Sequence, residues 1–176
     1  MKKRLMTTLL AVCALSASAD TWTDPDTGIV WNYTVSGGKA QVGIGGNSGT
    51  RAVLTSTTGE ITIPSTLGGN PVTSVGAYAF SGCGKLTSVT IPNSVTNIGE
   101  YAFRNCSDAL FDATTIPGVK LVGGWAVGYT SSLSGPLDLT GVRGIGENVF
   151  SYCSALTSVT IPGGVARIGD FRSSAR

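Results

Sequence analysis

Three regularly placed cysteines are the side chains in this sequence most able to do chemistry. Cys83, Cys106 and Cys153 each end a copy of the same short motif. A thiolate can act as a nucleophile or bind a metal, but both roles usually need a histidine nearby, and the chain contains none. We therefore expect buried apolar side chains in a ladder, with reactive or metal-binding thiols as the alternative.

Carboxylates give the other candidate site, a possible calcium loop near the start of the chain. The run Asp24-Pro25-Asp26-Thr27-Gly28 supplies oxygen ligands, but a calcium loop of the EF type needs glycine at its sixth position, where Ile29 stands. An Asp-rich turn is the better interpretation. The sequence thus predicts no catalytic group, no metal site and no cofactor.

The elements that carry these residues come from an internal repeat. Leu86-Thr87-Ser88-Val89-Thr90-Ile91-Pro92 recurs at 156–162, and a shorter copy ends at Pro64. A second motif, Val95-Thr96-Asn97-Ile98-Gly99-Glu100-Tyr101-Ala102-Phe103-Arg104-Asn105-Cys106, has counterparts at 72–83 and 142–153. Repetition at this period is the signature of stacked coils.

Each repeat can be interpreted as one coil of such a stack. Val89 and Ile91 share one face of a strand that Pro92 ends, because proline cannot donate a ladder hydrogen bond. Ile98 then returns to the interior, and Tyr101-Ala102-Phe103 is expected to form a short helical turn that buries Phe103. One coil cannot bury its own apolar side, so neighbouring coils must stack.

These motifs resemble the bacterial surface leucine-rich repeats typified by BspA, over Ile61 to Ile168. The resemblance implies a mainly β repeat solenoid, a right-handed stack of parallel strands with irregular or short helical outer turns. It also implies a secreted or surface adhesion protein, and it supplies no catalytic motif.

The sequence divides into three predicted parts. Residues 1–19 have the basic start, apolar run and Ala17-Ser18-Ala19 end of a signal peptide cleaved after Ala19. Residues 20–58 form a cap, with a β-hairpin from Ile29 to Ile44 and a loose Gly/Ser/Thr-rich connection. The repeats fill 59–176, irregular at 107–136, where Gly123-Gly124 predicts a second hairpin, and incomplete at the C-terminus.

Charge and hydropathy exclude two classes of partner. The chain is basic only because of Lys2, Lys3 and Arg4, so the part after the signal peptide offers no basic surface for nucleic acid. No apolar run is long enough for a transmembrane helix.

The exposed strand positions are the surface on which we expect a ligand to dock, because repeats of this type share that surface along the stack. They are Glu60, Thr62, Ser88, Thr90, Thr115, Asp138, Ser158 and Thr160. Solvated residues with no ligand are the alternative. Trp125 and Tyr129 are the candidate aromatic anchors.

Three functions remain open. The leading prediction is an exported module for protein–protein interaction or adhesion, with an unknown extracellular protein or polymer as partner. A truncated remnant of a longer array is the second, because the last coil stops at Arg176, and an uncapped end would favour self-association. A carbohydrate-binding or carbohydrate-active solenoid is the third, although Glu60 and Asp138, its acidic strand candidates, lie several coils apart.

Overall fold

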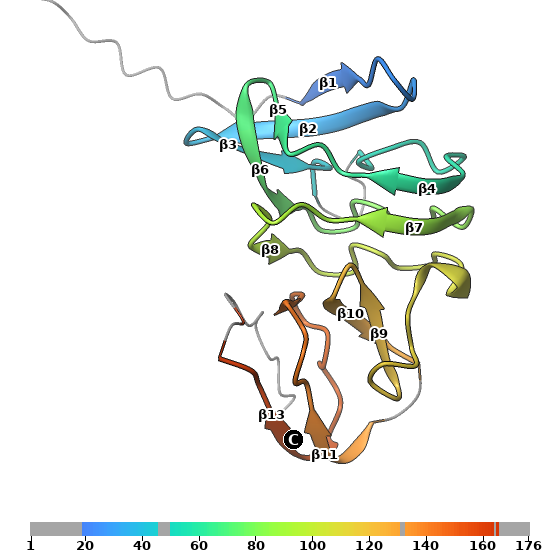
Figure 1. Cartoon of the computed structure of the whole chain (residues 1–176), viewed down its shortest axis with the longest axis vertical. Coiled ribbons are helices and arrows are strands. Elements are labelled where there is room, and N and C mark those ends of the chain that lie inside the picture. Colours follow the sequence, from blue (N-terminus) through green and yellow to red (C-terminus); the bar gives the residue numbers. More distant parts are fainter. Residues whose placement is uncertain (1–18, 46–49, 131–132, 164, 166–176) are drawn as a thin grey trace, which may run out of the picture.

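The computed structural model describes residues 19–45, 50–130, 133–163 and 165, which form short strands joined by tight turns (Figure 1). The described residues contain no α-helix and one 3-10 helix, η1 (Asp108–Leu110). The strands are β1 (Asp20–Thr23), β2 (Val30–Ser36), β3 (Lys39–Val42), β4 (Gly59–Thr62), β5 (Thr66–Leu67), β6 (Asn70–Val75), β7 (Leu86–Thr90), β8 (Asn97–Ile98), β9 (Val119–Val122), β10 (Trp125–Tyr129), β11 (Ser134–Asp138), β12 (Gly144–Ile145) and β13 (Ala155–Thr160).

The N-terminal hairpin predicted from the sequence is confirmed. Strands β2 and β3 pair antiparallel around Gly37 and Gly38, whose φ angles of 55° and 72° suit a tight turn that favours glycine. Strand β1 pairs with the outer edge of β2. On its other edge β3 pairs in parallel with β6, which pairs in parallel with β8, so the hairpin leads directly into the repeats.

The motif strands pair in parallel, but not as one continuous ladder. Ile61 of β4 lies opposite Val89 of β7, and Leu137 of β11 lies opposite Val159 of β13. These are two separate two-stranded sheets, and in Figure 1 β11 and β13 run in a different direction from β4 and β7. The expectation that the exposed strand positions share one surface along the stack is therefore wrong, because those positions belong to two separate sheets.

The interruption comes from the irregular segment between the two sheets. After Cys106 the chain forms η1 and then the antiparallel hairpin β9–β10, which turns at Gly123 and Gly124 as predicted. The hairpin lies between β7 and the β11–β13 pair (Figure 1). Hydrogen bonds still join the two regions: the N–H of Glu147 donates to the carbonyl of Ile98, and that of Gly146 to Ala126.

The outer turns differ from the expected helical turn. Tyr101 has a φ of 54°, and the matching residues of two other repeats, Tyr78 and Asn148, both have 57°. This left-handed conformation is incompatible with a helix and costs an L-residue about 1–2 kcal/mol. A second left-handed position precedes each cysteine, and Gly82, Asn105 and Tyr152 occupy it.

Stacked apolar side chains form the core along the repeats. Phe80 and Phe103 are almost fully buried, as are Leu86, Val89 and Ile91 of the second motif strand. The matching residues of the last described repeat, Leu156, Val159 and Ile161, are only half-buried.

The stretch predicted to be a loose connection contributes to this core. Ala52 and Val53 are fully buried, and the backbone of Ala52 accepts a hydrogen bond from the N–H of Asn32 and donates one to the carbonyl of Ala79. That prediction is wrong at these two residues because their small apolar side chains fill space between the hairpin and the first outer turn.

Candidate binding surfaces

Four of the predicted strand residues form a compact polar patch across β4 and β7. Glu60 lies opposite Ser88 and Thr62 lies opposite Thr90 in the parallel register. Glu60, Thr62 and Thr90 are exposed, and Ser88 is half-buried. Their alternation with buried Ile61 and Val89 keeps these polar side chains on the solvent side, as in any half-buried strand.

The lower pair of strands carries three more predicted residues. Asp138 lies opposite Thr160, and Ser158 lies opposite Pro136. All three predicted residues are exposed. The Asp138 carboxylate accepts hydrogen bonds from the backbone N–H of Thr140 at 2.8 Å and from its hydroxyl at 2.6 Å. These bonds stabilise the charged form and lower the pKa of Asp138. We call the seven residues of these two pairs of strands the strand face.

Thr115 does not belong to the strand face. It lies in a turn between η1 and β9, where its hydroxyl and its N–H both donate to Asp112. The prediction is wrong here because the repeat pattern fails after Cys106, and Asp112 instead organises a local turn. The hydroxyl and the backbone N–H of both Thr114 and Thr115 donate hydrogen bonds to the Asp112 carboxylate. These four bonds hold the pKa of Asp112 far below its ordinary value.

The two predicted aromatic anchors have opposite environments. Trp125 is only 2% exposed, so it is a core residue and not an anchor. Its ring packs onto Gly144, where a Cβ would lie 2.3 Å from the indole. Tyr129, in contrast, is 37% exposed.

Tyr129 lines a groove that the sequence analysis missed. The groove has a volume of about 260 Å³ and lies among outer-turn residues of two repeats and the β9–β10 hairpin. Tyr101 and Tyr152 line it too, and both are exposed, at 41% and 71%. We call it the tyrosine groove; its other lining residues are Phe103, Arg104, Phe111, Lys120, Val127, Gly128, Glu147, Asn148, Val149 and Ser151.

Local backbone irregularities position all three tyrosines. Tyr101 and Tyr152 occupy the two left-handed positions of the outer turns. Tyr129 follows a shift in register between Ala126 and Gly128, a bulge that redirects the end of β10. The only sequence signal was that glycine or asparagine fills the position before the cysteine in the other repeats, which marks a left-handed site at Tyr152.

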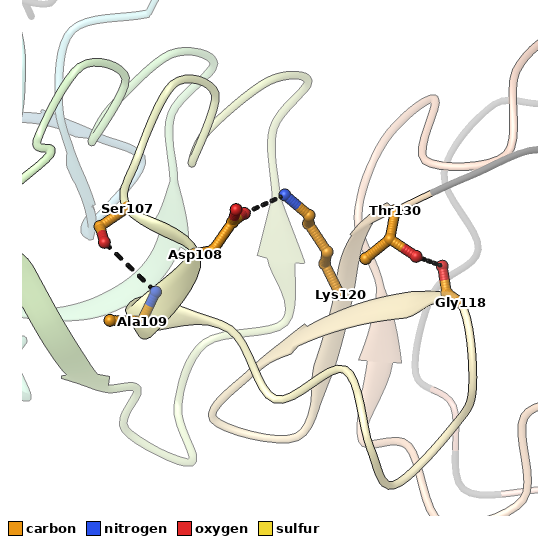
Figure 2. Close-up of polar contacts among 6 residues, drawn as sticks. All are labelled: Ser107, Asp108, Ala109, Gly118, Lys120 and Thr130. Carbon is orange, nitrogen blue, oxygen red and sulfur yellow. Dashed lines mark hydrogen bonds and ion pairs between the residues drawn. The ribbon is translucent and has the colours of Figure 1, made fainter.

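Charges in the tyrosine groove are of both signs. The Arg104 guanidinium lies over the Tyr101 ring, 5.4 Å from its centroid. Glu147 accepts a hydrogen bond of 3.1 Å from the Asn97 side chain. Lys120 reaches from β9 to Asp108 of η1 in an ion pair of 2.9 Å (Figure 2).

Short polar contacts hold the irregular segment in place beside the groove. Ser107 accepts a hydrogen bond from the N–H of Ala109 and so caps η1, while the Thr130 hydroxyl contacts the Gly118 carbonyl at 3.5 Å (Figure 2). Lys120 also lies over the Phe111 ring, 4.6 Å from its centroid. The wall of the groove is therefore fixed by both polar and aromatic contacts.

The cysteines have the environment expected of buried thiols. Cys83, Cys106 and Cys153 are free; Cys83 is fully buried and the other two are half-buried. Burial raises all three pKa values, that of Cys106 to about 12 with a further contribution from neighbouring Cys83. Cys106 also donates to the Phe80 carbonyl at 3.2 Å.

The Asp24 turn has the local hydrogen bonds expected of an Asp-rich turn. Its carboxylate accepts from the N–H of Asp26 and from the Thr27 hydroxyl. Across the described part of the chain, no cluster of three or more His, Cys, Asp or Glu side chains is arranged to hold a metal. Within the same residues, no helix is long and apolar enough to cross a membrane.

Comparison with known proteins identifies the repeat. The family model described as the BspA type leucine rich repeat region matches residues 55–171 in six copies. The chain belongs to this family. No curated protein matches it.

Three solved structures are similar at low identity. They are the leucine-rich-repeat protein of T. pallidum (21% identity, TM-score 0.36), a leucine-rich cell surface protein of Faecalibacterium prausnitzii (23%, 0.38) and the pneumococcal vaccine antigen PcpA (21%, 0.34). The matches cover 86%, 85% and 83% of this chain. They cover 61%, 45% and 39% of those proteins, so this chain spans less than two thirds of each.

Proposed function

We propose that the protein is an exported, non-catalytic binding module that docks an extracellular protein on the strand face. The observation that carries the proposal is the polar patch on β4 and β7. There, exposed side chains from two repeats lie directly opposite each other on a backbone fixed by parallel pairing. A preformed surface of this kind binds without the entropic cost of ordering a loop.

The carboxylates support a binding role over acid–base catalysis. A general acid at neutral pH needs a raised pKa, whereas hydroxyl and backbone donors lower the pKa of Asp24, Asp112 and Asp138. Glu60 and Asp138 belong to different sheets, so nothing pairs them as a glycosidase needs.

We further propose that the repeats form a right-handed solenoid with the N-terminal hairpin as its cap, and that residues 1–19 direct export. The parallel ladders β4–β7 and β3–β6–β8 support the first part, and the charge and hydropathy of the N-terminus support the second. The predicted signal peptide covers residues 1–19, of which 1–18 lie outside the described residues. Expression in a bacterium followed by N-terminal sequencing should give a chain that begins at Asp20.

The docking surface is tested by substitution at exposed positions. The chain should be displayed on a bacterial surface and its adherence to immobilised extracellular-matrix proteins measured, first for the natural sequence and then for Thr62→Arg with Thr90→Arg. The two arginines leave the core unchanged but cover the patch, so adherence should fall at least tenfold. Lys39→Glu, on the hairpin and away from the strand face, is the control. Adherence that is absent, or equal in all variants, contradicts the proposal.

A further inference from the structure

The tyrosine groove combines exposed aromatic rings with hydrogen-bonding groups of both kinds. Tyr101, Tyr129 and Tyr152 line the groove with partly exposed rings, and the Tyr101 ring also contacts Arg104 and Tyr78. Arg104 brings five N–H donors, and Asn148 can both donate and accept. Such a mixture of flat apolar surface and convergent polar groups is typical of a ligand site.

Backbone conformation indicates that two of these tyrosines are present for their side chains. A bulky residue at positive φ is a steric outlier, and such outliers gather at functional sites. The chain itself contains the less strained solution. Asn148 occupies the Tyr101 position in another repeat, and Asn105 and Gly82 occupy the Tyr152 position. The Tyr101 ring packs against Tyr78 and Arg104, whereas Tyr152 is 71% exposed, so the Tyr152 ring is the feature that needs an explanation.

The charges of the groove decide which class of ligand fits. Asp108 neutralises Lys120, and the remaining charged side chains, Arg104 and Glu147, are of opposite sign. An acidic or basic polymer would find no excess of opposite charge in the groove, whereas a neutral polar ligand would find both hydrogen-bond donors and acceptors. Neutral sugars have this character, with C–H groups on the ring face to stack on tyrosine and hydroxyls at the edge to bond with Arg104, Glu147 and Asn148.

We infer that the tyrosine groove is a binding site for a neutral oligosaccharide, separate from the strand face. Its volume of about 260 Å³ is close to the lower limit of small-molecule sites, about 300 Å³, and suits a short stretch of glycan. In this arrangement the exposed Tyr152 ring forms the stacking surface, and Tyr101 and Tyr129 line the groove beside it.

Isothermal titration with defined oligosaccharides tests the site. The probes are the neutral hexasaccharides of cellulose, chitin, xylan and mannan, with an alginate hexasaccharide as the acidic comparison. We expect the natural chain to bind at least one neutral hexasaccharide and to bind the alginate fragment at least tenfold more weakly.

The variants Tyr101→Asn and Tyr152→Asn separate binding from folding. Asparagine tolerates the left-handed conformation at each position, so both proteins should fold, and each should bind the neutral hexasaccharide at least tenfold more weakly. Trp22→Ala is the control, because it removes an exposed ring on β1, away from the groove. It should stay within threefold of the natural chain.

Three titration results would overturn the inference. They are no binding of any neutral hexasaccharide, preferential binding of the alginate fragment, and binding that Tyr101→Asn and Tyr152→Asn leave unchanged. If the chain bound no sugar but adhered to a protein, and if this adherence depended on Tyr101 and Tyr152, the groove would be a protein-binding site. That result would also contradict the inference. Loss of adherence through the strand-face arginines bears only on the strand face, so the two proposals fail independently.

Discussion

The rings of Phe80 and Phe103 stack one repeat apart, with centroids 5.2 Å apart and planes inclined by only 5°. Both side chains are buried, and the Trp31 ring of the N-terminal hairpin packs edge-on against Phe80 at 6.3 Å. Equivalent residues of successive repeats therefore occupy equivalent places, and an aromatic column joins the hairpin to the first two outer turns.

Replacing Phe103 by alanine should destabilise the protein by about 3–5 kcal/mol, because the substitution removes one ring of the column and leaves a cavity. Urea unfolding midpoints measure the loss. Trp22→Ala is the control, since Trp22 is 36% exposed on β1 and should cost much less. Equal losses in the two variants would contradict the assigned core.

Replacing Tyr152 by asparagine should stabilise the protein by about 0.5–1 kcal/mol, because asparagine accepts the left-handed conformation more readily than tyrosine does. Tyr152 has a φ of 70° and is 71% exposed, so few contacts are lost. Thermal unfolding measures the gain. Tyr129→Asn should bring none, because Tyr129 is not among the residues of positive φ. A lower melting temperature for Tyr152→Asn would mean that the ring contributes to the fold.

Replacing Arg143 by alanine should cost about 2–3 kcal/mol, because it leaves the part-buried carbonyls of Ile91 and Pro92 without their charged donor. The guanidinium donates to the carbonyls of Ile91, Pro92 and Gly123, and so joins the strand end of one repeat to the β9–β10 turn. Arg143→Lys should recover only a small part of the lost stability, since a compact ammonium lacks the planar fork with which the guanidinium spans the three carbonyls. Chemical denaturation compares the variants, with Lys85→Ala at an exposed turn as the control. Similar midpoints for Arg143→Ala and the natural chain would show that the bridge is unimportant.

The thiols should react slowly in the folded protein, and alkaline pH should destabilise it. Burial raises the pKa of Cys106 to about 12 from the usual value of 9.0. The stabilisation of the protonated thiol is complete below pH 9 and is lost as pH rises toward 12. Unfolding midpoints should therefore fall over this range, and less steeply in Cys106→Ala.

Labelling with an alkylating reagent at pH 8, followed by mass spectrometry of peptides, tests the reactivity of each thiol. Cys83 and Cys106 should be modified at least tenfold faster in denaturant than in its absence. Rapid modification of Cys106 in the folded protein would instead support a redox or metal-binding role.

Much of the fold could be predicted from residues that repeat. Leucine, valine, isoleucine and phenylalanine at fixed spacing identified the core positions, and the Gly123-Gly124 pair identified the turn of the second hairpin. The direction of the lower sheet could not be predicted, because it depends on how the segment between Cys106 and Leu133 packs. Burial of Trp125 depends on the missing side chain of Gly144, which is distant in sequence.

The binding surfaces were predicted unequally. Strand periodicity placed Glu60, Thr62, Ser88 and Thr90 correctly on the solvent side, because a strand alternates its side chains. The tyrosine groove was missed because two of its rings depend on left-handed backbone and the third on a bulge. Neither feature follows from periodicity. The only sequence signal for the left-handed backbone is the asparagine or glycine at the matching positions of other repeats.

The parallel pairing of β3 with β6 gives the molecule a preferred order of assembly. Strands β2 and β3 are joined by a short turn, so their pairing loses little loop-closure entropy and can form before any repeat is complete. The free edge of β3 is then available to pair with β6. Each repeat then adds to an edge already built, and the aromatic column grows in the same direction, from Trp31 to Phe80 to Phe103. A chain that emerges N-terminus first, from a ribosome or through a translocation pore, therefore meets its folding template before the segments that need it.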